Sequence, residues 1–117
     1  MKCISVRQPW ANLIASGKKT IETRTWRTRY RGTLAIASSK KPAIYPAGFV
    51  VCVAELVDCR PMTPADADFA GCDWYEGAWA WVLKNIRPVE PVRIKGSLGI
   101  YEIDYEIEGD FLMKGTG

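Results

Sequence analysis

Short segments rich in β-branched and aromatic residues, each closed by glycine or proline, follow one another through most of the chain. Between residues 101 and 108, tyrosine and isoleucine alternate strictly with acids, which is the pattern of a strand with one buried face. Residues 49–57 are almost entirely apolar and therefore predict a central strand that is buried on both faces. The remaining β-like segments are residues 3–7, 19–31, 33–37, 79–83 and 92–94.

Two short helices are predicted between these strands. The first runs from Pro9 to Gly17, because apolar residues repeat at helical spacing between a proline suited to a first turn and a glycine that ends it. The second begins at Thr63, with Pro64 at the first position and Asp66 in the place of a capping box. About six strands with two short helices, and no repeats, predict an α+β fold whose mostly antiparallel sheet closes into a β-barrel.

The 117 residues suit one domain, which we expect over residues 1–109, followed by a frayed tail over residues 110–117. The sequence has no run of about 18 apolar residues and no signal-peptide pattern at its start. We therefore expect a cytoplasmic protein that does not bind membranes.

The four cysteines form no C-x-x-C pair, and the chain contains no histidine. A zinc site of the Cys/His type is therefore excluded, and the thiols are expected to be reduced and partly buried. We predict neither a metal nor any other cofactor.

Positive charge is concentrated at the N-terminal end. Residues 1–41 contain ten Lys/Arg and one acid, whereas residues 42–117 contain six Lys/Arg and twelve acids. Clustered basic residues favour a polyanionic partner, because they release condensed counterions when they contact phosphates. The alternative is a solvated basic face that packs beside the acids of the other segment.

The segment from Gly17 to Gly32 carries the densest set of reactive and aromatic side chains. A carboxylate, a guanidinium and an aromatic ring at strand spacing suit a site that reads a base edge, holds a phosphate and stacks a ring. A Glu–Arg pair beside a half-buried tryptophan explains the same spacing equally well. Side chains of a continuous strand point alternately to its two faces. One face of this segment would then carry Glu22, Arg24, Trp26 and Tyr30, and the other would carry Lys19, Arg27, Arg29 and Arg31.

Five sequence elements carry a family resemblance: ISVRQPWA at 4–11, G-x-K-x-I-E-x-R-x-W at 17–26, YRG-x-L-x-IAS at 30–38, WVL at 81–83 and KG-x-x-G at 95–99. Together they resemble the ASCH domain family across nearly the whole chain. The resemblance implies a PUA-like barrel with a cleft lined by the second element, proposed to bind RNA or other nucleic acids. It also implies that Gln8 and Trp10 lie near this cleft, whereas the apolar helical stripe that contains Trp10 favours a core position for that residue.

Some small members of that family resemble amidohydrolases that act on acylated cytidines through a lysine, a threonine and a glutamate, and others have been reported as ribonucleases. Lys19 matches the lysine, but Glu22 stands in the place of the threonine. Ala37 stands where many relatives carry a histidine, so acid–base chemistry here depends on Lys19, Glu22, Tyr30 or another carboxylate such as Glu55 or Glu76.

The sequence thus predicts a nucleic-acid binding module for RNA or a modified nucleotide. One alternative is a hydrolase that uses Lys19 and Glu22 as catalytic residues, on N-acylated nucleosides or on RNA. Another is a domain whose basic segment binds an acidic protein. The predicted ligand-binding residues are Gln8, Trp10, Lys19, Glu22, Arg24, Trp26, Arg29, Tyr30, Arg31 and Ser38.

Overall fold

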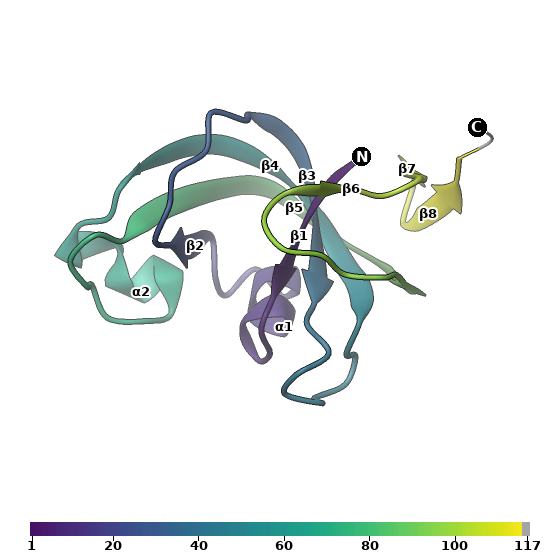
Figure 1. Ribbon diagram of the computed structural model, residues 1–117, viewed down its shortest axis with the longest axis horizontal. Coiled ribbons are helices and arrows are strands. Elements are labelled where there is room, and N and C mark those ends of the chain that lie inside the picture. Colours follow the sequence, from purple (N-terminus) through teal and green to yellow (C-terminus); the bar gives the residue numbers. More distant parts are fainter. Residues whose placement is uncertain (116–117) are drawn as a thin grey trace.

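Most of the regular secondary structure is β-strand within residues 1–115, which are the residues that the structure, a computed structural model, describes (Figure 1). The main sheet has the strand order β2-β5-β4-β3-β1-β6, and β7 and β8 form a separate hairpin. The strands are β1 (Lys2–Val6), β2 (Ile21–Arg24), β3 (Gly32–Ser38), β4 (Phe49–Pro61), β5 (Trp79–Arg93), β6 (Tyr101–Glu102), β7 (Tyr105–Glu108) and β8 (Phe111–Lys114).

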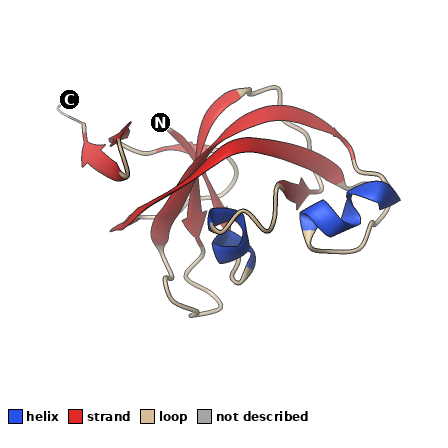
Figure 2. Cartoon of the chain, turned by 180° about the vertical axis from the view of Figure 1, so that it is seen from behind, coloured by secondary structure: helices blue, strands red, loops and turns tan. Residues whose placement is uncertain are grey.

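The helical segments are short, and the one that follows β1 lies apart from the other two, which are consecutive in the chain (Figure 2). Helix α1 (Trp10–Ala15) follows β1 and packs against β3, β4 and β5. The 3₁₀-helix η1 (Pro64–Asp66) and helix α2 (Ala67–Ala70) lie in the connection between β4 and β5, next to β2. Both predicted helix positions are therefore confirmed.

Strands β4 and β5 form a long antiparallel hairpin that organises the sheet. Both faces of its centre are covered, which is why residues 49–56 are almost all apolar. On one face Leu56 and Trp81 pack with Ile14 of α1, and on the other Val53 packs with Leu112 of the C-terminal hairpin. This burial on two faces accounts for the uninterrupted apolar run.

The prediction of a closed barrel is wrong, because the sheet is open and mixed. Strand β1 runs parallel to β3, and within residues 1–115 the edge strands β2 and β6 do not pair with each other. Two features of the edges prevent closure. Strand β6 pairs with β1 only at Lys2 and Cys3, and β2 ends at Arg24 after four residues. The edge of β1 beyond these pairs therefore faces a gap.

Three segment boundaries also differ from the prediction. Residues 79–83 and 92–94 belong mostly to one strand, β5, which continues through Pro88 and Pro91 because its edge beyond the short partner β2 is open. Residues 101–108 divide into β6 and β7, which pair with different partners. Of the tail that we expected over residues 110–117, Phe111–Lys114 form β8, and residues 116–117 lie outside the described residues. The domain boundary at residue 109 stays a prediction.

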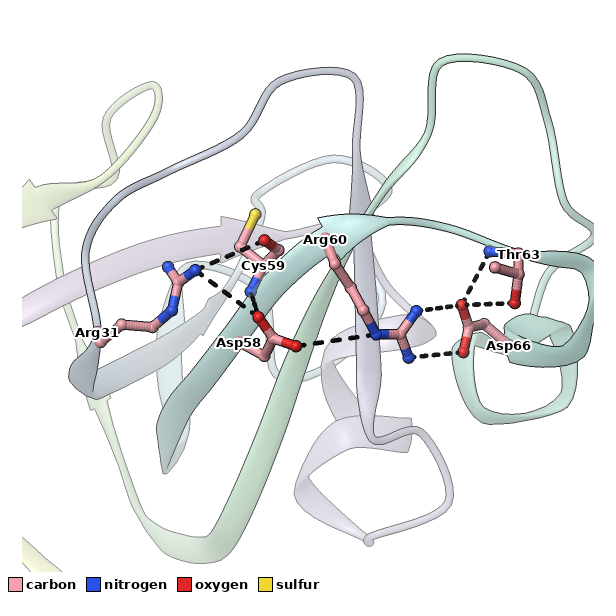
Figure 3. A network of polar contacts seen from close by, with 6 residues as sticks. All are labelled: Arg31, Asp58, Cys59, Arg60, Thr63 and Asp66. Atoms are coloured by element: carbon pink, nitrogen blue, oxygen red, sulfur yellow. Dashed lines mark hydrogen bonds and ion pairs between the residues drawn. The ribbon is translucent and has the colours of Figure 1, made fainter.

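A polar network joins the end of β4 to η1 (Figure 3). Arg60 donates two hydrogen bonds to the carboxylate of Asp66, at 2.7 and 2.9 Å, and Asp66 also accepts the backbone N–H of Thr63 at 2.9 Å. The capping box predicted at Thr63 is thereby confirmed. Arg60 and Arg31 both approach Asp58, at 3.9 and 3.8 Å, which links the segment before β3 to the same network.

Replacement of Asp66 tests how much this network stabilises the fold. We expect Asp66→Ala to lower the free energy of unfolding by about 1–2 kcal/mol at neutral pH, since it removes both the cap and the partner of Arg60. Hydrogen bonds from Arg60 hold the pKa of Asp66 well below its usual range. The stabilisation is therefore complete above about pH 4 and is lost as the pH falls below it.

Urea unfolding at several pH values measures this difference, with the exposed Asp68 replaced by alanine as the matched control. A difference between wild type and Asp66→Ala that stays constant from neutral pH to pH 2 would contradict the role of the charged carboxylate.

Candidate functional site

A cavity of about 360 Å³ lies in the gap between β1 and β2. Helix α1 ends at Ala15, and Gly17, which follows two residues later with a positive φ of 79°, lets the chain turn back towards β2. The backbone amides of Lys18 and Lys19 then both donate to the carbonyl of Leu13, which holds this turn beside the helix end. The cavity is lined by Ser5, Val6, Arg7, Trp10, Lys19, Glu22, Thr23, Arg24, Cys72 and Tyr75.

Three charged side chains in this cavity, Lys19, Glu22 and Arg24, form a connected group that we call the ion triad. The carboxylate of Glu22 lies between the two cations, with Oε1 3.4 Å from the Nζ of Lys19 and Oε2 3.0 Å from the Nη2 of Arg24. The triad thus has a net charge of one positive unit, and each oxygen of its carboxylate is oriented by a separate cation.

Burial distinguishes the triad from an ordinary surface ion pair. The side chain of Lys19 is 2% exposed and that of Glu22 is 9% exposed. Besides contacting Glu22, the ammonium of Lys19 donates a hydrogen bond to the carbonyl of Ala70 at the end of α2. A buried ammonium is tolerated only when such partners replace its water. Helix α2 and strand β2 therefore hold Lys19 in one position.

Arg24 spans the gap between the two strands. Its Nη2 donates to the carbonyl of Ser5 on β1 at 2.7 Å while also contacting Glu22. Within the described residues its Nε is buried without a hydrogen-bond partner. A buried donor without an acceptor is uncommon, so this guanidinium has hydrogen-bonding capacity that the protein itself does not use.

The walls of the cavity combine aromatic rings with small polar groups. Trp10 is 36% exposed and Tyr75 is 38% exposed, so both present ring surface to solvent at the cavity. The hydroxyl of Thr23 and the thiol of Cys72 are 3.8 Å apart. An acceptor carboxylate, donor guanidinium and exposed rings in one cavity suit a planar ligand with a polar edge and a negative charge.

Of the residues that the sequence predicts for the site, Trp10, Lys19, Glu22 and Arg24 are brought together in this cavity. The other six lie elsewhere. Gln8 is buried beside α1, where it accepts the amide of Asn12 and donates to the carbonyl of Pro46. Ser38 exchanges hydrogen bonds with the backbone of Phe49, at 3.2 Å in both directions.

Trp26, Arg29, Tyr30 and Arg31 fall outside the cavity because β2 ends at Arg24, so strand parity does not continue to them. Trp26 packs edge-on against Trp81 with ring centroids 4.8 Å apart. The hydroxyl of Tyr30 donates to the carbonyl of Thr33. Arg29 and Arg31 line a separate shallow depression together with Arg27, so a role in ligand binding stays a prediction for these residues.

Six residues of the cavity were not predicted: Ser5, Val6, Arg7, Thr23, Cys72 and Tyr75. Arg7 carried a usable signal, since it adjoins Gln8 in the motif at residues 4–11. Tyr75 carried none. It reaches the cavity through the placement of the connection between α2 and β5, which only the fold determines.

A model of the ASCH domain family matches residues 4–93. Activating signal cointegrator 1 from Homo sapiens and from Mus musculus are each 29% identical over 131 aligned residues, which cover 90% of this chain and 22% of those proteins. The chain therefore spans about a fifth of the length of these curated relatives.

The fold also resembles solved structures. The crystal structure of ASCH from Zymomonas mobilis gives a TM-score of 0.70 at 19% identity, covering 87% of this chain and 86% of that one. A tyrosine-to-phenylalanine mutant of that protein gives a TM-score of 0.65 at 17% identity, with coverage of 87% and 88%. At these identities the likeness is one of fold.

Proposed function

The chain belongs to the ASCH domain family, and we propose that it binds RNA by holding one nucleotide in the cavity between β1 and β2. The observation that carries this proposal is the ion triad, which places a carboxylate and a guanidinium side by side in a cavity with exposed aromatic rings. A single-stranded nucleotide presents a matching set of groups, because its base edge is free to hydrogen-bond and its ring is free to stack.

Each group of the cavity has a partner on such a ligand. The carboxylate of Glu22 accepts N–H groups of a base edge, and the guanidinium of Arg24 donates to a base carbonyl or a phosphate oxygen. The rings of Trp10 and Tyr75 supply stacking surface, and Arg7 adds a second cation for the phosphate. The cavity volume of about 360 Å³ lies within the range of small-ligand sites.

The charge of the surrounding surface supports the same proposal. All of the cations in the cavity come from the basic N-terminal segment of residues 1–41. Arg27, Arg29 and Arg31 line a further depression on the same segment. Cations that gather around a nucleotide site strengthen binding to a polyanion and make it sensitive to salt.

Replacement of Arg24 tests the proposed function. We expect Arg24→Ala to weaken binding of a labelled single-stranded RNA octamer by about 1–3 kcal/mol, or roughly 5- to 150-fold in Kd, because it removes a fork of donors that no other side chain replaces. Arg24→Lys retains the charge but not the fork, so it should restore only part of the affinity. Fluorescence anisotropy at low salt measures both variants.

The matched control is Arg87→Ala, since Arg87 is exposed on β5 and lines none of the cavities described here. Circular dichroism checks that each variant is folded. Wild-type protein that fails to bind the octamer at low salt, or folded Arg24→Ala that binds it as tightly as wild type, would require this proposal to be abandoned.

One observation favours a second function at the same place. Lys19 and Glu22, the pair that the sequence predicts as catalytic, are 3.4 Å apart and both line the cavity. Hydrolysis of an N-acylated nucleoside or of RNA is therefore the second candidate. The ammonium of Lys19 donates to the carbonyl of Ala70 and contacts the carboxylate of Glu22, and both are acceptors. These contacts suit a positively charged group that positions a ligand better than a neutral amine that acts as a general base.

Incubation of N-acetylcytidine and of a labelled RNA with wild type and with Lys19→Met separates hydrolysis from binding alone. Product that forms with wild type and disappears with folded Lys19→Met would support the hydrolase. Identical product levels for the two proteins would exclude Lys19 as a catalytic residue.

A further inference from the structure

A second cavity, of about 460 Å³, lies on the other side of β1. Its two sides are the segment that follows β3, at Ser39 and Lys40, and the segment that follows β5, at residues 94–98. The amide of Ile94 donates to the carbonyl of Gly48 at 3.1 Å, and the amide of Ser39 donates to the carbonyl of Val6 at 2.9 Å. These backbone contacts hold both sides of the cavity to the sheet.

The chemistry of this second cavity is that of an anion site. Its lining residues include Lys40 and Lys95 and no aspartate or glutamate. Neither lysine makes an ion pair within residues 1–115, in contrast to Lys2, which pairs with Glu102 at 2.7 Å. Two exposed, unpaired ammonium groups beside serine hydroxyls are the groups that contact phosphate oxygens.

Local packing positions one of these lysines. The carbon stem of Lys40 lies across Gly48, where a Cβ would come within 3.3 Å of its Cγ. Gly48 also has a positive φ of 82°, which a larger residue adopts only with strain. The position of the Lys40 side chain therefore depends on the absence of a side chain at Gly48.

The face of the cavity at β1 is uncharged. The hydroxyls of Ser5 and Tyr101 are 2.6 Å apart, and Gly96 lies so close that a Cβ would be 3.2 Å from the Oγ of Ser5. Burial raises the pKa of Tyr101, so its phenol stays protonated at neutral pH. Ser5, which lines the cavity, is thus hydrogen-bonded to an uncharged partner, and this face adds no negative charge that would repel a phosphate.

The two cavities share one lining residue, Ser5, near the end of β1. Its carbonyl is bonded to Arg24 at the first cavity, and its hydroxyl lies next to Gly96 of the second. We infer that the second cavity binds the phosphodiester backbone that flanks the nucleotide held in the first, so that the ligand is an RNA strand lying across β1 and not a free nucleotide. This inference rests on the proposed function, because it extends the same ligand.

The test compares ligands of different length. We expect wild type to bind a single-stranded RNA octamer more tightly than the corresponding 5′-mononucleotides. In the double variant Lys40→Ala/Lys95→Ala, the octamer should bind more weakly, and the slope of log K against log salt concentration should become less negative by about 1.4, or about 0.7 for each lost phosphate contact. Mononucleotide affinity should stay unchanged.

The matched control is Lys84→Ala/Lys114→Ala, which removes the same charge from residues that line neither cavity. An octamer affinity and salt slope equal to those of wild type in the Lys40/Lys95 variant, or a loss equal to that of the control, would overturn the inference. The proposed function would still stand if Arg24→Ala weakened binding of the same octamer. Conversely, octamer binding that depends on the two lysines but not on Arg24 would support the second cavity and overturn the nucleotide pocket.

Discussion

Replacement of Glu22 by alanine is expected to lower the free energy of unfolding by about 3–5 kcal/mol. Glu22 is the only anion of the ion triad, and its removal leaves the buried ammonium of Lys19 with a backbone carbonyl as its remaining partner. Desolvation of that ammonium is then no longer balanced by a counter-ion. Chemical denaturation in urea, with the slope compared between variants, measures the change.

Two further variants separate charge from packing. Glu22→Gln keeps the shape and one acceptor but loses the charge, so its cost should be smaller, about 1–3 kcal/mol. The double variant Lys19→Met/Glu22→Leu removes the buried cation together with its partner and should recover much of the lost stability. A Glu22→Ala protein as stable as wild type would mean that Lys19 finds water or another acceptor after the substitution.

The second large effect is expected at Trp81, and Trp81→Ala should cost about 3–5 kcal/mol. Trp81 is fully buried, and its indole N–H donates to the carbonyl of Trp26 at 3.3 Å. It also lies opposite Glu22 in the pairing of β5 with β2. Loss of the ring therefore leaves a cavity in the core and weakens the strand that carries the ion triad.

Trp81→Phe retains an aromatic ring and should cost clearly less than Trp81→Ala, since the cavity it leaves is smaller. Trp74 supplies a surface control, because it is 45% exposed and its alanine variant removes less buried area. Thermal unfolding ranks the three variants. If Trp74→Ala and Trp81→Ala proved equally destabilising, burial of Trp81 would not be the main contribution of that residue.

Local sequence signals predicted much of the secondary structure. The apolar run at residues 49–57 marked the central strand because both of its faces are covered. The Thr63–Asp66 capping box marked the start of η1 because its hydrogen bonds join residues three apart in the chain. Such patterns can be recognised in a sequence, because the residues that interact are close together in the chain or because all residues of one segment are buried alike.

Whether the sheet closes into a barrel could not be predicted from such local patterns. The same succession of strands is compatible with a closed barrel or an open sheet, and the outcome depends on whether the two edges meet. Here β2 stops at Arg24 and β6 spans two residues, and both lengths follow from long-range packing. The extended reading of residues 19–31 was wrong beyond Arg24 for the same reason, because β-forming residues do not pair without a partner strand.

The candidate site divides along similar lines. Alternation within β2 predicted that Glu22 and Arg24 share a face. The same parity put Lys19 on the opposite face, but Lys19 lies before the strand begins, and its ammonium is 3.4 Å from Glu22. Trp26 and Tyr30 are also an even number of residues from Glu22, but they follow the end of β2 at Arg24, so the alternation does not apply to them. Tyr75 reaches the cavity from the connection between α2 and β5, and no spacing rule relates it to β2.

The contact between Arg24 and Ser5 takes the place of a backbone ladder. In a closed sheet, neighbouring strands are joined by a row of backbone hydrogen bonds at a fixed spacing. Here the opening between β1 and β2 is bridged by the guanidinium of Arg24, 2.7 Å from the carbonyl of Ser5. A shorter side chain at position 24 would leave that carbonyl without this donor and would widen the entrance to the cavity.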